Sequence, residues 1–234
     1  MTVRSWQSKA DAHWATETGC EKNEFFELPV RLKAHGEAMA DYNGIYALFR
    51  EGRVIVSFPK DRMGLLASGL PGDRLSPDLF AAHFGNQGYR VIGPAFIGYT
   101  TSIGEIEEGA RALDASDQAA AESLRADCRE TEWDHGGSNP AEQPCSGVFD
   151  EGRLAALAGY EVWSGTIAHL SVVTHPAFRG RGHGRRAVAH LAARALEAGL
   201  VAQYRTLEAK PASMRIAAGL GFDCYATSVA VRLS

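Results

Sequence analysis

The most constraining feature of the sequence is a strand, a glycine-rich turn and a helix in direct succession at residues 166–199. The apolar run at residues 166–174 predicts a strand, and apolar residues recur at helical spacing over residues 187–196. Gly180, Gly182 and Gly184 lie between them, and glycine allows positive φ and close approach to a ligand. The free N–H groups of a helix N-terminus favour negative charge, so we predict a pyrophosphate-binding loop. Four arginines add positive charge to the loop: Arg179, Arg181, Arg185 and Arg186.

The segments on either side of this loop predict a mixed sheet. Residues 154–163 and 166–174 are β-rich runs separated by Ser164-Gly165, a plausible hairpin turn. Gly199 ends the helix, and residues 201–207 predict a strand parallel to residues 166–174 because the order strand, helix, strand requires a crossover. A helix over residues 211–219 and a strand over residues 225–233 complete this part.

The N-terminal part predicts a smaller α+β unit. Two β-rich runs, at residues 44–50 and 53–58, flank a Glu51-Gly52 turn. Short helices over residues 63–70 and 76–84 follow, with Ser76 as N-cap, and then a strand over residues 89–99. The chain becomes acidic after residue 100, with a short strand near residues 105–113, a helix from about Ser116 and a loop at residues 133–144. We therefore predict one domain at residues 1–100 and a second at residues 101–234.

Composition excludes several classes of protein. The formal net charge is −4, which argues against bulk attraction to nucleic acid, and no run approaches the roughly 20 apolar residues of a membrane span. We expect a cytoplasmic protein that partners neither nucleic acid nor membrane. The cysteines are scattered, without a C-x-x-C pair or a neighbouring His cluster, so we expect no metal site. They are Cys20, Cys128, Cys145 and Cys224.

Two motifs at residues 105–234 resemble the GNAT superfamily of acyl-CoA-dependent N-acyltransferases. Arg179-x-x-Gly182-x-Gly184 is similar to the acyl-CoA motif of that family, and Ser213-x-x-Ile216-Ala217-x-x-Leu220-Gly221-Phe222 is similar to its helix leading into a Leu-Gly-Phe strand entry. The resemblance implies an α/β (α+β mixed sheet) fold of the GNAT type. This fold has a splayed pair of parallel strands, here preceded by a small α+β N-terminal domain. Residues 1–100 would be an accessory domain for substrate recognition or for homodimer formation, or a degenerate relative of the same fold.

The resemblance also implies an N-acetyltransferase that uses acetyl-CoA as cosubstrate and transfers its acetyl group to a primary amine of a small molecule or peptide by direct attack. The resemblance also implies contacts to acetyl-CoA from the predicted strand 166–174, the glycine loop and the last helix. The residues are Val172, Val173, Arg179, Gly180, Arg181, Gly182, His183, Gly184, Arg185 and Ser213. No enzyme nucleophile is needed, but a base must take the proton of the ammonium substrate.

The catalytic groups are less clearly marked. Glu161 and His169 lie on strands predicted to line the cleft and are our candidates for the base, although packing and hydrogen bonding explain both positions equally well. The family often has Tyr as general acid where this chain has Ala217, and Asn where it has Lys210. Tyr225 is therefore our candidate acid, with a packed strand tyrosine as the alternative. Trp133 and His135 are candidate substrate contacts on the predicted loop.

Two other functions compete with the enzyme. The lack of a helix tyrosine and the extra N-terminal part favour a non-catalytic acyl-CoA-binding sensor or regulatory domain. The basic run 179–186 could instead be a nucleic-acid patch, but it lacks interleaved aromatic residues and belongs to an acidic chain. The acyl acceptor and the acyl chain length are not encoded in any motif of the sequence.

Overall fold

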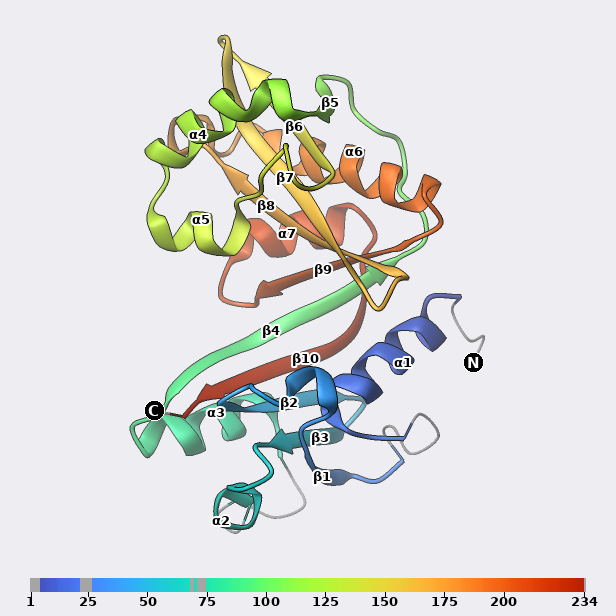
Figure 1. The fold of residues 1–234 in the computed structure, drawn as a ribbon, viewed down its shortest axis with the longest axis vertical. Coiled ribbons are helices and arrows are strands. Elements are labelled where there is room, and N and C mark those ends of the chain that lie inside the picture. The colour runs from blue at the N-terminus through green and yellow to red at the C-terminus, as the bar shows by residue number, and fades with distance from the viewer. Residues whose placement is uncertain (1–4, 22–26, 68–69, 71–74, 234) are drawn as a thin grey trace. The chain divides into compact units, whose positions relative to one another are not determined.

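The strands and most of the helices expected from the sequence are present in the computed structural model, which describes residues 5–21, 27–67, 70 and 75–233 (Figure 1). In this part of the chain ten strands follow the hydrogen-bonded order β1-β3-β2-β10-β4-β9-β8-β7-β6-β5. The chain divides into two compact units. The first comprises the residues up to Gly98 together with 205–214 and the residues from Cys224 on, and the second comprises 99–204 and 215–223.

The first unit contains the predicted hairpin and the elements around it. β2 and β3 pair in antiparallel fashion through the Glu51-Gly52 turn, where φ is 50° and 75°, as the sequence predicts. Ser76 caps α3 as expected, because its side chain accepts a hydrogen bond from the Leu79 amide. Residues 68–69 of the predicted helix 63–70 lie outside the described residues. The elements are α1 Gln7–Thr18, β1 Val30–Ala34, η1 Glu37–Met39, β2 Gly44–Arg50, β3 Arg53–Phe58, α2 Met63–Ala67, α3 Pro77–Asn86, β4 Arg90–Thr100 and β10 Asp223–Arg232.

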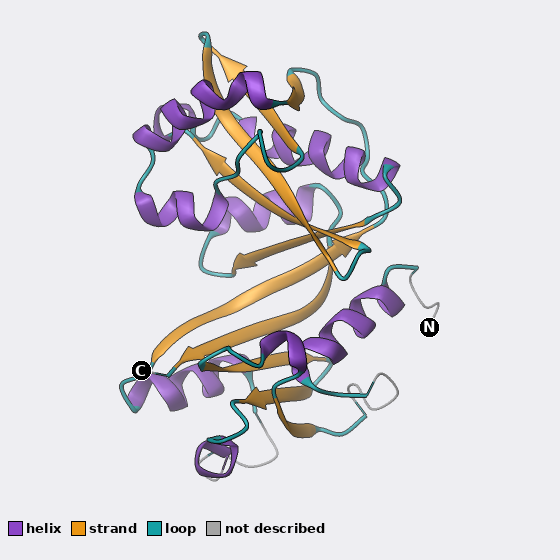
Figure 2. Ribbon diagram, in the orientation of Figure 1, coloured by secondary structure: helices purple, strands orange, loops and turns teal. Residues whose placement is uncertain are grey.

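The second unit contains the glycine loop and its sheet (Figure 2). Turns at residues 151–152 and 164–166 connect β6 to β7 and β7 to β8, with positive φ at Glu151, Gly152, Ser164 and Gly165. β4, β9, β10 and α7 contribute residues to both units. The elements are β5 Ala110–Leu113, η2 Ala115–Asp117, α4 Gln118–Asp127, α5 Glu130–Gly136, β6 Cys145–Asp150, β7 Arg153–Trp163, β8 Ile167–Thr174, η3 Pro176–Phe178, α6 His183–Glu197, β9 Val201–Leu207 and α7 Pro211–Gly219.

The domain boundary predicted near residue 100 differs from this division at the C-terminal end. Residues 205–214 and those from Cys224 on cluster with the N-terminal part, because β10 pairs with β2 over six residues. A separate N-terminal domain is therefore not evident from the strand order. The assignment of accessory and catalytic roles to residues 1–100 and 101–234 stays a prediction.

One predicted loop is partly wrong. Residues 130–136 form α5, so Trp133 and His135 lie on a helix rather than on a loop. The Glu132 side chain accepts a hydrogen bond from the Arg129 amide and so satisfies a free N–H group at the start of this helix. The turn residues that favoured a loop, Gly136 and Gly137, are placed at the end of the helix instead.

Candidate active site

The glycine loop joins the end of β8 to the start of α6, as the sequence predicts. The His175 side chain accepts a hydrogen bond from the Ala177 amide and caps η3. Gly180 and Gly182 both have φ of +81°, and Gly182 is the N-cap residue of α6. A Cβ added at either glycine would meet no described atom within 4 Å, so packing does not explain the glycines. Backbone conformation and open space in front of the helix N-terminus fit an anion cradle.

Gly184 has a packing role in addition to its predicted cofactor contact, which stays a prediction. It lies in the first turn of α6 and does not have positive φ. A Cβ there would come within 2.8 Å of the Thr174 Oγ1 atom, which is too close. Gly184 therefore lets the first turn of α6 pack directly on the end of β8.

Each arginine of the loop meets an acidic or histidine side chain from the same unit. Arg179 Nη2 lies 3.0 Å from Glu132 Oε2, and this hydrogen bond lowers the pKa of Glu132. Arg181 Nη1 lies 3.3 Å from Asp150 Oδ2. The remaining two pairs are Arg185 with Glu107 and Arg186 with His183. The positive charge that the sequence shows at this loop is thus largely balanced by carboxylates from elsewhere in the chain.

His183 anchors the first turn of α6. Its side chain is 5% exposed, its Nε2 atom lies 2.9 Å from Asp150 Oδ2, and its Nδ1 atom lies 2.6 Å from Arg186 Nη2. The arginine can only donate, so Nδ1 accepts and Nε2 donates to Asp150. The His183 side chain is therefore occupied in holding the loop, and its backbone N–H is the group that can face a ligand.

β8 and β9 run parallel and separate partway along their length. Their register extends from Ile167↔Val201 to Leu170↔Tyr204, while β8 continues to Thr174 and stays paired with β7. The His175 amide donates to Ala155 on the β7 side, so odd-numbered residues of β8 point their backbone groups toward β7. Val172 points its N–H and C=O to the edge where β9 has separated, whereas Val173 points toward β7. Val172 is therefore the better placed of the two predicted pantetheine contacts.

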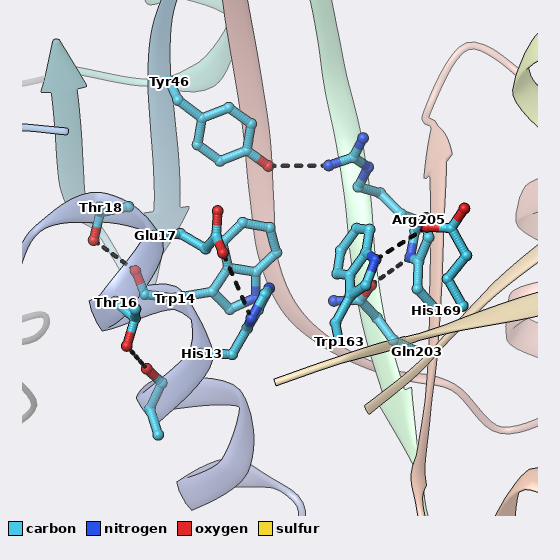
Figure 3. A network of polar contacts seen from close by, with 12 residues as sticks. His13, Trp14, Thr16, Glu17, Thr18, Tyr46, Trp163, His169, Gln203 and Arg205 are labelled. Atoms are coloured by element: carbon cyan, nitrogen blue, oxygen red, sulfur yellow. Dashed lines mark hydrogen bonds and ion pairs between the residues drawn. The ribbon is translucent and has the colours of Figure 1, made fainter. Parts of the chain in front are cut away.

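The two predicted bases lie next to each other on the sheet. Glu161 and His169 are directly paired across β7 and β8, so their side chains project from the same face. Trp163 stacks on the His169 ring with centroids 3.8 Å apart, and its Nε1 atom donates to Glu161 Oε2 at 3.4 Å. His169 Nδ1 lies 2.6 Å from Gln203 Oε1, a contact drawn in Figure 3. Trp163 and Gln203 were not predicted from the sequence; the only signal was a polar Gln203 directly after the apolar residues Val201 and Ala202 that begin β9.

A sequence model of the acetyltransferase (GNAT) family matches residues 110–222, the segment that carries the loop, the separating strands and the Leu220-Gly221-Phe222 entry. This C-terminal segment, residues 110–222, belongs to the acetyltransferase (GNAT) family. The resemblance seen in the sequence is thereby confirmed, and with it the class of enzyme, an N-acetyltransferase family that uses acetyl-CoA. A search of curated proteins found no match.

Solved structures agree with this GNAT assignment. A GNAT-family protein from Novosphingobium aromaticivorans is 25% identical with a TM-score of 0.51; the match covers 62% of this chain and 66% of that protein, just under two thirds of its length. An acetyltransferase of the GNAT family from Colwellia psychrerythraea shares the fold over 100% of this chain and 99% of its own, with a TM-score of 0.54 and 11% identity. A GCN5-related N-acetyltransferase-like protein from Streptococcus suis is 14% identical with a TM-score of 0.50, covering 81% of this chain and 83% of its own.

The predicted substrate contacts of the GNAT segment lie on α5. Trp133 packs against the buried cluster formed by β5, β6, α4, β7 and β8, and Arg125 lies 5.8 Å above its ring. This surrounding favours a role of Trp133 in packing the core, the alternative to a substrate contact. His135 is exposed, and its Nδ1 atom lies 2.6 Å from the Thr131 carbonyl oxygen on the same helix. A substrate contact by either residue stays a prediction.

Ser213 and Tyr225 belong to the first unit, whereas the loop and the base candidates belong to the second. The Tyr225 side chain is 2% exposed and its hydroxyl donates to Asp11 Oδ1 at 2.9 Å. Arg50 also donates to Asp11 and lies 5.0 Å from the centre of the Tyr225 ring. This network supports the packing interpretation of Tyr225, and its role as general acid stays a prediction.

Metal sites and membrane-spanning helices can be assessed for the described residues. No group of three or more His, Cys, Asp or Glu side chains there lies close enough together to bind a metal ion. Among the helices of that same part of the chain, none combines the length and the apolar character that crossing a membrane requires.

Proposed function

We propose that this chain transfers the acetyl group of acetyl-CoA to a primary amine of a small molecule or peptide, by direct attack of the amine on the thioester. The observation that carries the proposal is the separation of β8 from β9 after Leu170 and Tyr204, immediately before a glycine loop that opens α6. This arrangement offers a strand edge with which β9 no longer pairs and a helix N-terminus for phosphates along one continuous stretch of chain.

The loop residues would bind the phosphates of acetyl-CoA. The amides of residues 180–185 and the side chains of Arg179, Arg181 and Arg185 supply the donors, since charge-assisted bonds from arginine to phosphate are strong. The Val172 N–H and C=O would pair with the pantetheine amides, and an N–H at this edge would polarise the reacting carbonyl. Acetyl-CoA itself supplies the activated acyl group and the thiol leaving group. Ser213, at the start of α7, stays a further predicted contact.

His169 is the base that the geometry supports best. An ordinary histidine has a pKa near 6.5, so its neutral form is abundant near pH 7 and can accept a proton from an ammonium group. The ring is held by Trp163 and Gln203, whereas Glu161 is an exposed carboxylate that contacts the Trp163 Nε1–H. Glu161 would then act through its negative charge, which favours an ammonium substrate near His169.

Release of CoA in the presence of amines tests the proposal. Purified protein is incubated with acetyl-CoA and a panel of primary amines, including polyamines, aminoglycosides and peptides with free N-termini, and free thiol is measured. We expect CoA release that depends on one class of amine and that falls by about 100-fold or more in His169→Gln, because general bases contribute about 10²–10⁴ in rate.

The same assay separates the enzyme from a non-catalytic acyl-CoA sensor. A sensor would bind acetyl-CoA in calorimetry and yet release no CoA with any amine. The buried Ala217 on α7 and the Tyr225 hydroxyl committed to Asp11 are the observations that favour a sensor, since neither position offers a ready proton donor. Binding without turnover across the whole panel would replace the enzyme proposal with that alternative.

A further inference from the structure

We propose that Gln203, held in turn by Tyr99, fixes the tautomer of His169 and so acts as a positioning residue for the base. This inference rests on the proposed function for its catalytic consequence. It rests on the geometry of the second unit alone for the tautomer itself, because Tyr99, His169 and Gln203 all belong to that unit.

Gln203 is a polar side chain in a fully buried position. Its exposed fraction is 0%, and it lies on β9 at the residue directly paired with His169 on β8. Burying an amide without hydrogen bonds costs about 1–3 kcal/mol, so such a residue is normally satisfied on both of its polar atoms. Here the Nε2 atom donates to the Tyr99 hydroxyl at 2.6 Å, and the Oε1 atom faces His169 Nδ1 at 2.6 Å.

The orientation of this amide decides where the His169 proton lies. The amide nitrogen donates to the Tyr99 hydroxyl and the amide oxygen faces His169, and an amide oxygen can only accept. Nδ1 must therefore carry the hydrogen, and in the neutral ring the lone pair lies on Nε2. A base needs its lone pair directed at the proton that it removes, so the amide presents Nε2 to the acceptor amine.

Trp163 fixes the remaining freedom of the ring. The indole and imidazole planes differ by only 13° at a centroid separation of 3.8 Å (Figure 3). Stacking sets the plane of the imidazole and the Gln203 hydrogen bond sets its rotation within that plane. The indole Nε1 atom in turn bonds Glu161, so the carboxylate and the ring are held as one group.

Imidazole ¹⁵N spectra test the tautomer without reference to acetyl transfer. Uniformly ¹⁵N-labelled protein is measured near pH 9, where an ordinary histidine is neutral, and His169→Gln identifies the signal. We expect the Nδ1–H form in the native protein. We expect it to be lost in Gln203→Met, which keeps the size of the side chain without an acceptor, and kept in Gln203→Glu, which retains one. In Tyr99→Phe the amide is free to reverse and both tautomers should appear.

Kinetics supply the second readout. Gln203→Met should lower kcat by about tenfold or more while leaving KM for acetyl-CoA unchanged, and Gln203→Glu should recover much of that loss. Thermal melting of each variant shows whether it folds. If the Gln203 variants do not fold, the tautomer of His169 in Tyr99→Phe, which keeps the aromatic ring, tests the positioning role instead.

The two proposals fail in different ways. An Nε2–H signal in the native protein, or the same spectrum in Gln203→Met, would overturn the positioning role whatever the activity. If the tautomer follows Gln203 but His169→Gln retains full kcat, the positioning contact stands and the assignment of His169 as the base is wrong.

Discussion

Replacing Gly182 with glutamate is the sharpest test of the anion cradle. The new side chain would begin in open space at the N-cap of α6, where a bound phosphate would lie, and would add a negative charge there. At 4 Å two unit charges repel by about 1 kcal/mol in water and about 4 kcal/mol at an effective dielectric of 20. Gly182 is exposed, so we use the lower value of about 1 kcal/mol and expect acetyl-CoA to bind about fivefold more weakly or worse.

Gly199 supplies a matched control at the opposite end of the same helix. Its φ is +79°, close to the +81° of Gly182, and no described atom lies within 4 Å of a Cβ placed there. Both substitutions therefore carry a similar backbone cost, on the order of 1–2 kcal/mol for a side chain with positive φ. Gly182→Ala adds that cost without the charge, so it separates conformation from repulsion.

Isothermal titration calorimetry with acetyl-CoA measures the three variants, and urea unfolding measures their stability. We expect Gly182→Glu and Gly199→Glu to lose similar stability, Gly199→Glu to keep the native Kd, and Gly182→Ala to lose less affinity than Gly182→Glu. If Gly182→Glu and Gly199→Glu bind acetyl-CoA equally well, the loop does not hold the phosphates and the assignment of the cradle is wrong.

Three predictions concern buried groups. Burial, and then the positive charge of Arg205, lowers the pKa of His13 from 6.5 to about 4. Below pH 6.5 the unfolded chain therefore binds a proton that the folded protein does not, so the free energy of unfolding should fall as pH drops from about 6.5 to 4. His13→Leu should flatten that part of the curve in urea unfolding at several pH values. Gly184→Ala should cost about 1–3 kcal/mol in the same assay, and Thr174→Ala should recover part of it. Tyr225→Phe should lower the free energy of unfolding by about 1.5–3 kcal/mol, because it removes the hydrogen bond to the Asp11 carboxylate. It should change kcat less than tenfold, and a 100-fold fall in kcat would instead identify Tyr225 as the general acid.

The predictions that succeeded rest on signals local to the chain. Two X-Gly pairs, at residues 51–52 and 164–165, give hairpin turns with positive φ because glycine and its neighbour accept the twist that a tight hairpin turn requires. The glycine loop is equally local, since Gly180 and Gly182 supply positive φ within a few residues of a helix start. The succession of strand, loop and helix there follows from neighbouring residues and needs no contact with distant parts of the chain.

The errors arise where distant residues decide the outcome. Gly136 and Gly137 favour a loop in the sequence, yet Gly136 is the last residue of α5. A Cβ there would overlap the Val172 carbonyl oxygen, a contact across 36 residues. The packing of Gly184 against Thr174 likewise joins residues that no motif relates, and it adds to the predicted cofactor contact of Gly184 rather than replacing it. No local pattern relates Gln203 to Tyr99 either, because that hydrogen bond joins residues 104 positions apart.

The charge of the loop shows the same limit and changes how the cradle works. Arg179, Arg181 and Arg185 pair with Glu132, Asp150 and Glu107, which come from three other segments. Exposed pairs of this kind contribute about 0–1 kcal/mol each, so phosphates can exchange with the carboxylates at little cost and with little net gain. The amides of the first turn of a helix have no partner within the helix and face outward whatever the arginines do. The backbone N–H groups therefore supply the part of the anion affinity that does not depend on the arginine pairs. Salt screens the attraction of the arginines to phosphate and to the competing carboxylates alike. Raising the salt concentration should therefore weaken acetyl-CoA binding less than it would for a cluster of unpaired arginines.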